Sequence, residues 1–261
     1  MPRFLSIAGL LLVVLAAPAA AQMVRVAAAA DLEPVLPPLF AEFHRTTGID
    51  AEATYQSSAA LTTQIENGAP FDLFFSANMD YPKRLIGDGL AEGAGEGKAG
   101  TPILYARGTL VLWTRKDAHL PPPSLELLRN PALKTLAIAN PQRAPYGKAA
   151  VAALQKLGLY DALKPRLVTA ENIAQAAQFV DSGNADAGLI SMTAAMTPRL
   201  ASSGSYFVIP RDLYPPIEQG AVILSKSSER AAAKKLLDYL MSPPVQEELR
   251  QRGLTPANGA P

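Results

Sequence analysis

The chain of 261 residues contains no cysteine and only two histidines, His44 and His119. The absence of cysteine excludes disulfides, thiolate metal sites and cysteine nucleophiles. Two histidines are too few for a multi-histidine metal site, and the sequence has no Gly-x-Ser-x-Gly motif of the kind that carries a serine nucleophile. Because no partner for proton transfer stands out, we predict that the protein is not an enzyme.

The chain also lacks an excess of charge of either sign, since Lys and Arg number 24 and Asp and Glu number 23. A general nucleic-acid binder needs a basic stripe, so we expect no nucleic-acid partner. Binding of a small anion stays open, because it depends on local dipoles. Hydrophobic residues make up 49% of the chain, which is ample for a folded core.

Long apolar runs are missing except at the N-terminus, where 4–16 is almost purely apolar after Arg3. The small residues 19–21 then fit a cleavage site, so we predict a signal peptide over 1–21. The run is short for a membrane span, although an uncleaved anchor is the alternative. Since no later stretch approaches about 18 uninterrupted apolar residues, we expect the mature chain to be exported and soluble.

Strand-like and helix-like segments alternate along the rest of the chain. Short apolar runs are typical of buried strands, and apolar residues at helical spacing indicate amphipathic helices. The runs include 24–30, 135–139 and 187–191, and the helical patterns include 32–47, 147–157 and 173–182. Such alternation predicts an α/β fold with mostly parallel sheets, in which ligands lie at the carboxyl ends of strands. Pro37 and Pro38 predict a kink or a late start in the first helix.

Two turns from strand to helix in the first half of the chain are suited to an anion. In the first, four alanines ending at Ala30 allow close backbone approach, and Asp31 suits a helix N-cap. In the second, Ser57 and Ser58 offer hydroxyl donors beside the free N–H groups of a helix start. Each turn is also compatible with ordinary helix capping.

Two further turns of this kind lie in the second half. Gly147 permits close backbone approach, and Lys148 adds a positive charge in a first helical turn. The turn at 169–173 leads into a helix at Ile173. Without a nucleotide-binding glycine motif, the four turns together suggest N–H and O–H donors that converge on a small anion.

Several short segments of the sequence form one recognisable pattern. The most specific is 68–77, which reads GAPFDLFFSA. The other segments are 26–32 (VAAAADL), 55–58 (YQSS), 64–67, 140–141, 145–147, 154–158, 212–217 and 253–254. Together they resemble the periplasmic molybdate-binding proteins of ABC importers, and the resemblance covers nearly all of residues 24–255.

The resemblance implies a two-lobed α/β fold, the type II periplasmic-binding-protein fold, with the ligand in the cleft between the lobes. We expect lobe 1 to comprise 22–104 and 217–261, and lobe 2 to comprise 105–216. The chain would cross between lobes near 101–107 and near 215–220.

The resemblance also implies a set of ligand contacts. Positions that match the family's contacts are Asp31, Ser58, Tyr146, Ile173 and Ser191, with Ala30, Ser57, Gly147 and Lys148 in supporting positions. Molybdate would be held as an oxyanion through Ser58, Tyr146 and Ile173, the last two by backbone N–H groups. Some family members have serine in place of Asp31 and tyrosine in place of Ser191. A carboxylate repels a dianion, so we expect Asp31 to contribute its N–H and to turn its side chain away.

The implied function is capture of molybdate, and of tungstate, for the membrane permease of an ABC importer, by a periplasmic monomer without a cofactor. Phosphate keeps a proton at neutral pH and sulfate is smaller, so a site of neutral donors would disfavour both. One alternative is a receptor for sulfate, phosphate or an organic acid, the last with Arg143 as its clamp. A secreted enzyme and an exported sensor or adhesion module are the others.

Overall fold

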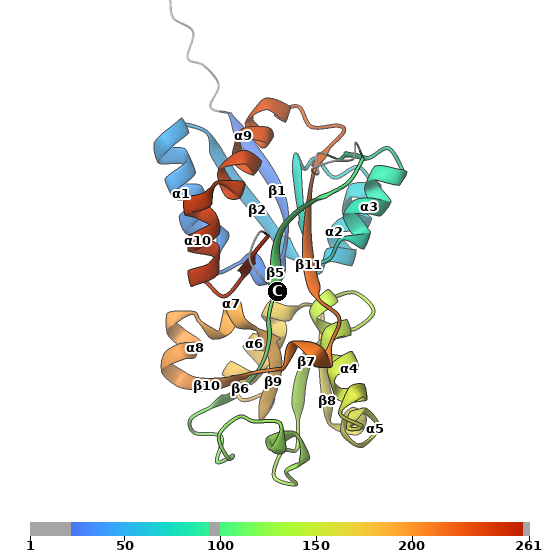
Figure 1. The fold of residues 1–261 in the computed structure, drawn as a ribbon, viewed down its shortest axis with the longest axis vertical. Helices are drawn as coiled ribbons and strands as arrows, with labels where there is room; N and C mark the ends of the chain where they lie inside the picture. Colours follow the sequence, from blue (N-terminus) through green and yellow to red (C-terminus); the bar gives the residue numbers. More distant parts are fainter. Residues whose placement is uncertain (1–21, 94–99, 258–261) are drawn as a thin grey trace, which may run out of the picture.

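The computed structural model describes residues 22–93 and 100–257, so the predicted signal peptide over 1–21 lies outside the described residues. The fold has two lobes, each built on one β-sheet with helices on its faces (Figure 1). Both sheets mix parallel and antiparallel pairs. The predicted α/β class and two-lobed architecture are confirmed, whereas the expectation of mostly parallel sheets is wrong.

The larger lobe contains the sheet whose strand order is β12-β5-β11-β3-β1-β2, with β4 paired to β11. Strand β1 pairs in parallel with both β2 and β3, while β11 runs antiparallel to β3 and β5. The strands are β1 (Met23–Ala29), β2 (Asp50–Gln56), β3 (Leu73–Ser76), β4 (Ala91–Glu92), β5 (Ile103–Gly108), β11 (Ile217–Leu224) and β12 (Thr255–Pro256). The helices of this lobe are α1 (Leu36–Thr47), α2 (Ser58–Glu66), α3 (Asp80–Gly87), α9 (Arg230–Met241) and α10 (Pro243–Gln251).

The smaller lobe contains the sheet of order β10-β6-β9-β7-β8. Its strands are β6 (Leu110–Arg115), β7 (Leu136–Ala139), β8 (Leu167–Ala170), β9 (Ala187–Ser191) and β10 (Gly204–Val208). Its α-helices are α4 (Pro145–Lys156), α5 (Tyr160–Leu163), α6 (Ile173–Asp181), α7 (Met192–Ala195) and α8 (Pro198–Ser203). Three 3-10 turns, η2 (Glu126–Arg129), η3 (Lys164–Arg166) and η4 (Arg211–Leu213), complete it.

The chain passes between the lobes through β5 and β11, which pair side by side (Figure 1). Strand β5 belongs to the larger sheet up to Gly108, and β6 begins the smaller sheet at Leu110. The expected boundary after residue 104 falls inside β5, which stays paired with β11 to its last residue. On the return path, β11 begins at Ile217, where the boundary was expected.

The first helical pattern is interrupted by prolines. A short 3-10 turn, η1 (Ala30–Leu32), follows β1 directly, and α1 starts only at Leu36 with prolines at its first positions. Proline lacks an N–H and clashes with a preceding turn, so it is tolerated at a helix start but not inside the helix. The predicted helix over 32–47 is thus shortened at its N-terminal end, as the two prolines indicated.

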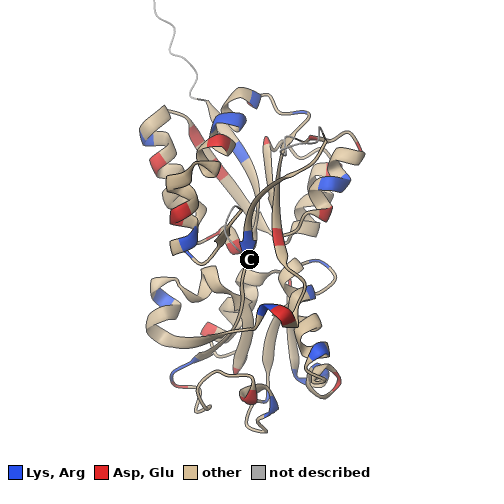
Figure 2. Ribbon diagram, viewed as in Figure 1, with Lys and Arg blue, Asp and Glu red and all other residues tan. Residues whose placement is uncertain are grey.

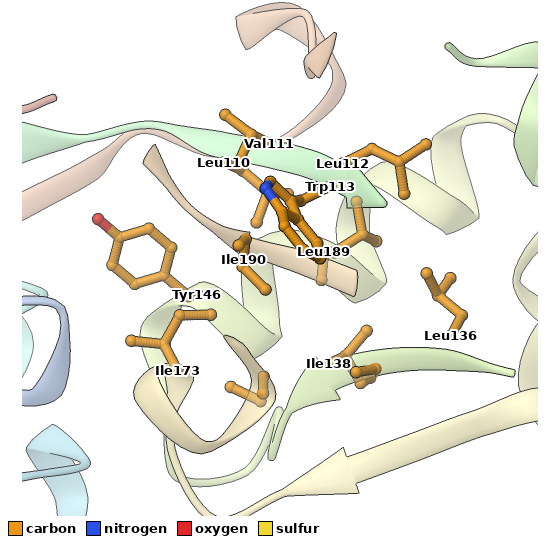
Figure 3. Close-up of a cluster of buried hydrophobic side chains, with 14 of the residues drawn as sticks. Leu110, Val111, Leu112, Trp113, Leu136, Ile138, Tyr146, Ile173, Leu189 and Ile190 are labelled. Atoms are coloured by element: carbon orange, nitrogen blue, oxygen red, sulfur yellow. The ribbon is translucent and has the colours of Figure 1, made fainter. Parts of the chain in front are cut away.

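The hydrophobic core of the smaller lobe surrounds β6, β7 and β9. Trp113, Leu110 and Ile138 are almost fully buried there, together with Ile190 and Tyr146. Figure 3 shows the Tyr146 ring at the edge of this cluster, with its hydroxyl oxygen turned away from the labelled aliphatic side chains. The ring is therefore held by packing in the smaller lobe, while its polar end is available to a partner elsewhere.

Charged residues of both signs are interspersed over the outer helices of the two lobes (Figure 2). Within the described ranges, the helices are all too short or too polar to traverse a bilayer. The same part of the chain holds no cluster of three or more His, Asp or Glu side chains placed to ligate a metal ion.

Candidate anion site

A small cavity lies between the lobes, at the carboxyl ends of strands from both sheets. The predicted turns meet here, because the cavity is lined by residues of η1 and of the N-termini of α2, α4 and α6. The lining residues are Ala29, Ala30, Asp31, Gln56, Ser57, Ser58, Ala77, Ala144, Pro145, Tyr146, Asn172 and Ile173. Four of the five predicted contact residues, Asp31, Ser58, Tyr146 and Ile173, are thus brought together.

Ser58 is buried at the first position of α2, and its hydroxyl oxygen accepts the Ala77 N–H at 3.0 Å. That bond uses an acceptor lone pair and leaves the hydroxyl proton free to be donated. Its neighbour Ser57 is the N-cap of α2, with its Oγ 3.4 Å from the Ala60 nitrogen. Ser57 therefore caps helix α2, while Ser58 presents a hydroxyl donor to the cavity.

The N-terminus of α4 supplies backbone donors. Pro145 and Tyr146 occupy the first turn, and Ala144 makes no side-chain cap to the helix. The first N–H groups of a helix have no intrahelical acceptor, so those of Tyr146 and Gly147 are free to bind an anion. A Cβ at Gly147 would collide with the Ala139 carbonyl at the end of β7, so this glycine serves the packing of helix against strand. Lys148 is exposed and does not line the cavity.

The N-terminus of α6 faces the cavity in the same way. Asn172 is its N-cap, and the amide oxygen of this side chain accepts the Gln175 N–H at 2.9 Å. The Ile173 N–H precedes that capped position and is not consumed by it, while the Ile173 side chain packs in the smaller lobe (Figure 3). The Ile173 N–H thus has no acceptor within the helix, and its side chain adds to the apolar packing beside the cavity.

Asp31 lies in η1 and is 1% exposed. Its Oδ2 accepts two hydrogen bonds, from the Tyr146 hydroxyl at 3.0 Å and from Gln219 Nε2 at 2.6 Å. Burial raises the pKa of the Asp31 carboxyl to about 6, against the opposing effect of these two donors. Burial also raises the pKa of Tyr146 well above its ordinary value, and the nearby Asp31 adds to that rise. Asp31 thus turns its carboxyl toward partners from β11 and α4, and its titration is shifted toward neutral pH.

Ser191 does not line this cavity. Its buried hydroxyl caps α7 by accepting the Ala194 N–H at 3.3 Å, and it lies 2.9 Å from the Thr193 hydroxyl. Thr193 in turn donates to the Asp31 carbonyl at 2.8 Å. Ser191 is therefore not brought together with the other four predicted contact residues. Its hydroxyl lies at the start of α7, with Thr193 between it and Asp31.

The sequence profile of the family described as bacterial extracellular solute-binding proteins matches residues 24–255. The molybdate-binding protein ModA of Azotobacter vinelandii is 39% identical over 92% of both chains, and that of Rhodobacter capsulatus is 38% identical over 92% of this chain and 90% of its own. The chain belongs to the ModA family of bacterial extracellular solute-binding proteins.

Solved structures agree with this assignment. The periplasmic molybdate-binding protein of A. vinelandii superposes with a TM-score of 0.79 at 32% identity, covering 89% of this chain and 98% of that one. The sulfate-binding protein SubI of Mycobacterium tuberculosis superposes with a TM-score of 0.76 at 16% identity, which shows a shared fold alone. The resemblance seen in the sequence is confirmed.

This ModA-family chain contains two site residues that the sequence analysis missed. Gln219 is fully buried in β11, and its side-chain oxygen accepts the Tyr105 hydroxyl of β5 at 2.6 Å. Gln219 is the one long polar side chain in the otherwise small or apolar run 219–224, and that isolation is the signal that could have revealed it. Tyr105 carries no comparable signal in the sequence.

The charges around the cavity are sparse. Among the described residues that line it, Asp31 is the only acid, and none is Lys, Arg or His. Arg143, the candidate clamp for an organic acid, is exposed and forms an ion pair with Glu171 at 3.2 Å. The arrangement can therefore bind an anion through N–H and O–H groups and helix dipoles, without a counter-cation.

Proposed function

We propose that the protein captures molybdate, and also tungstate, as a tetrahedral dianion in the cavity between its lobes. The observation that carries the proposal is the convergence of the Ser58 hydroxyl with the free N–H groups of α4 and α6 on one cavity without a lining cation. The ligand contacts we propose are Ser58, the backbone of Tyr146 and Ile173, and Asp31. The family relationship to proteins named for molybdate binding supports the choice of ligand.

The physical argument concerns desolvation. An anion that leaves water must have its oxygens hydrogen-bonded, because each unmade bond in a dry site is costly. Neutral donors at helix N-termini meet this need, and the helix dipoles supply partial positive charge. Proteins of this fold class close their lobes around a ligand, which gives a partner a distinct shape to recognise. We propose that the closed form is a periplasmic monomer that delivers the anion to the permease of an ABC importer.

The test is calorimetric titration and thermal unfolding of residues 22–261 with molybdate, tungstate, sulfate or phosphate. We expect tight binding of the first two, and a ligand at about 1,000 times its Kd should stabilise the fold by about 4 kcal/mol. Weak or absent binding of sulfate and phosphate would establish selectivity. Absence of binding by molybdate and tungstate would overturn the proposal.

A receptor for an organic acid is the second candidate. The two candidates differ in whether ligand binding depends on the Arg143 side chain. A bidentate Arg clamp would make binding depend on this side chain. Because Arg143 is exposed and paired with Glu171, we expect Arg143→Ala to leave molybdate affinity within about twofold of the parent. A loss of about tenfold or more would favour the organic acid instead.

A further inference from the structure

We propose that Asp31 carries a proton on Oδ1 when the anion is bound and donates it as a hydrogen bond to a ligand oxygen. Binding of one dianion would then take up one proton from solvent. The inference rests on the proposed function and adds a specificity-determining residue to it.

The first observation is that the two carboxylate oxygens of Asp31 have unequal surroundings. Oδ2 accepts from the Tyr146 hydroxyl and from Gln219 Nε2. The Gln219 amide is oriented by Tyr105, whose hydroxyl donates to the Gln219 oxygen at 2.6 Å, so its nitrogen must face Asp31. An oxygen that already accepts two hydrogen bonds suits the carbonyl oxygen of a carboxylic acid, and the proton belongs on the other oxygen.

The second observation is that this other oxygen is free. Oδ1 of Asp31 is buried and, among the described residues, has no hydrogen-bond partner, although Asp31 lines the cavity. A buried carboxylate oxygen without a donor is costly in the ionised state. A proton on Oδ1 removes the charge, and a ligand oxygen in the cavity gives that proton an acceptor.

The third observation is that none of the cationic side chains in the described ranges 22–93 and 100–257 forms an ion pair with Asp31, so none holds it ionised beside an anion. The tyrosines on the elements around it are Tyr146 of α4, Tyr105 of β5 and Tyr55 of β2. The charged groups on these elements or beside them include Asp181 of α6 paired with Arg199, Glu218 of β11 paired with Arg107, Lys148 on the exposed face of α4, and Glu33 beside η1. The contact from α7 is the neutral Thr193 hydroxyl on the Asp31 carbonyl. Burial already raises the pKa of the Asp31 carboxyl to about 6, and a bound dianion would raise it further.

Ligand binding is coupled to protonation of the Asp31 carboxylate. The ionised carboxylate and one proton from solvent give the neutral acid, and the anion keeps both its charges. Above the pKa of the free protein, the affinity for a dianion should therefore fall about tenfold for each pH unit.

The test measures how many protons the protein takes up from solvent when it binds molybdate. Molybdate is titrated into residues 22–261 at about pH 8 in buffers of different ionisation enthalpy, and the slope of the binding enthalpy gives the protons taken up per ligand. We expect about one proton per molybdate for the parent protein. Asp31→Asn, which keeps a carbonyl oxygen and places an N–H donor at Oδ1, should take up none and bind with an affinity independent of pH.

Asp72→Asn is the matched control. Asp72 is also buried, but both its oxygens are occupied, by the Arg25 N–H at 2.8 Å and the Ser227 hydroxyl at 2.7 Å, and it does not line the cavity. This variant should keep the full proton uptake. Tight molybdate binding by the parent protein without proton uptake would overturn the role of Asp31 and leave the proposed function standing. Absence of molybdate and tungstate binding would instead overturn the proposed function.

Discussion

The hydroxyl of Tyr146, in the smaller lobe, donates a 3.0 Å hydrogen bond to the carboxylate of Asp31, in the larger lobe. The two residues are 115 positions apart in the sequence. Other hydrogen bonds cross the same boundary. Beside the cavity, they include those from Thr193 to the Asp31 carbonyl at 2.8 Å, from the Ala59 N–H to the Arg143 carbonyl at 3.3 Å and from Gln219 Nε2 to the Tyr146 hydroxyl at 3.3 Å. The lobes are therefore closed on one another, and polar groups next to the cavity join them.

The absence of a side chain at Gly108 leaves room for this bond. A Cβ at Gly108 would overlap the Tyr146 hydroxyl, and it would also lie 3.1 Å from Gln219 Nε2. Gly108→Ala should push Tyr146 away from Asp31 and weaken molybdate binding by about 1–3 kcal/mol, the usual cost of overpacking. Calorimetry measures the change, and Gly87→Ala is the control, since its Cβ would meet nothing within 4 Å. Unchanged affinity in Gly108→Ala would show that the Tyr146 position does not matter for binding.

The hydrogen bond from Thr193 to the Asp31 carbonyl also holds the two lobes together, and it can be removed with little change in shape. Thr193→Val keeps the shape of the side chain but removes the donor to the Asp31 carbonyl, at a cost of about 1 kcal/mol. We expect a fivefold or so lower affinity for molybdate, about the factor that this cost implies, and a larger radius of gyration by small-angle scattering without ligand. Thr63→Val, which loses only a bond to the Ala59 carbonyl within α2, should change neither quantity.

Substitution of Ser58 should weaken ligand binding, whereas substitution of its neighbour Ser57 should lower the stability of the fold. Ser58→Ala removes the donor that faces the cavity, and hydrogen bonds to charged groups contribute about 1.5–3 kcal/mol, so affinity should fall by about tenfold or more. Ser57→Ala removes the N-cap of α2 and should lower the free energy of unfolding by about 1 kcal/mol. Titrations and denaturant melts on both variants test this division. The opposite pattern, with Ser57→Ala the weaker binder, would contradict it.

The raised pKa of Asp31 predicts a pH dependence of stability without ligand. Between the ordinary value of 3.8 and the folded value of about 6, the native protein binds more protons than the unfolded chain. The contribution of Asp31 to stability is therefore full below pH 3.8 and is lost as pH rises through 6. Asp31→Asn should remove this loss and be more stable than the parent above that pH by up to about 3 kcal/mol, with no gain below it. Denaturant melts from acid to neutral pH measure the difference, and equal stability at all pH values would show that Asp31 does not titrate in this range.

Local sequence patterns were sufficient for the elements that carry their own signals. In α1 the buried positions Leu36, Leu39, Phe40 and Phe43 follow helical spacing, and Gly48 with φ of 71° ends the helix. The all-buried strand β7 was expected from the short apolar run 135–139. By contrast, β10 and β8 are the partly exposed edge strands of the smaller sheet, so neither stood out from the residues around it.

By itself, the sequence determined the α/β class, the family and the turns that carry the donors, because these depend on local periodicity, capping residues and short motifs. Only the tertiary structure decided which partners reach Asp31. Gln219 lies 188 positions away and arrives because β11 returns beside β5 at the crossing between lobes. The structure likewise places the Ser191 hydroxyl at the start of α7, where it accepts the Ala194 N–H. Such contacts depend on how distant strands are ordered in a sheet, and no local pattern encodes that order.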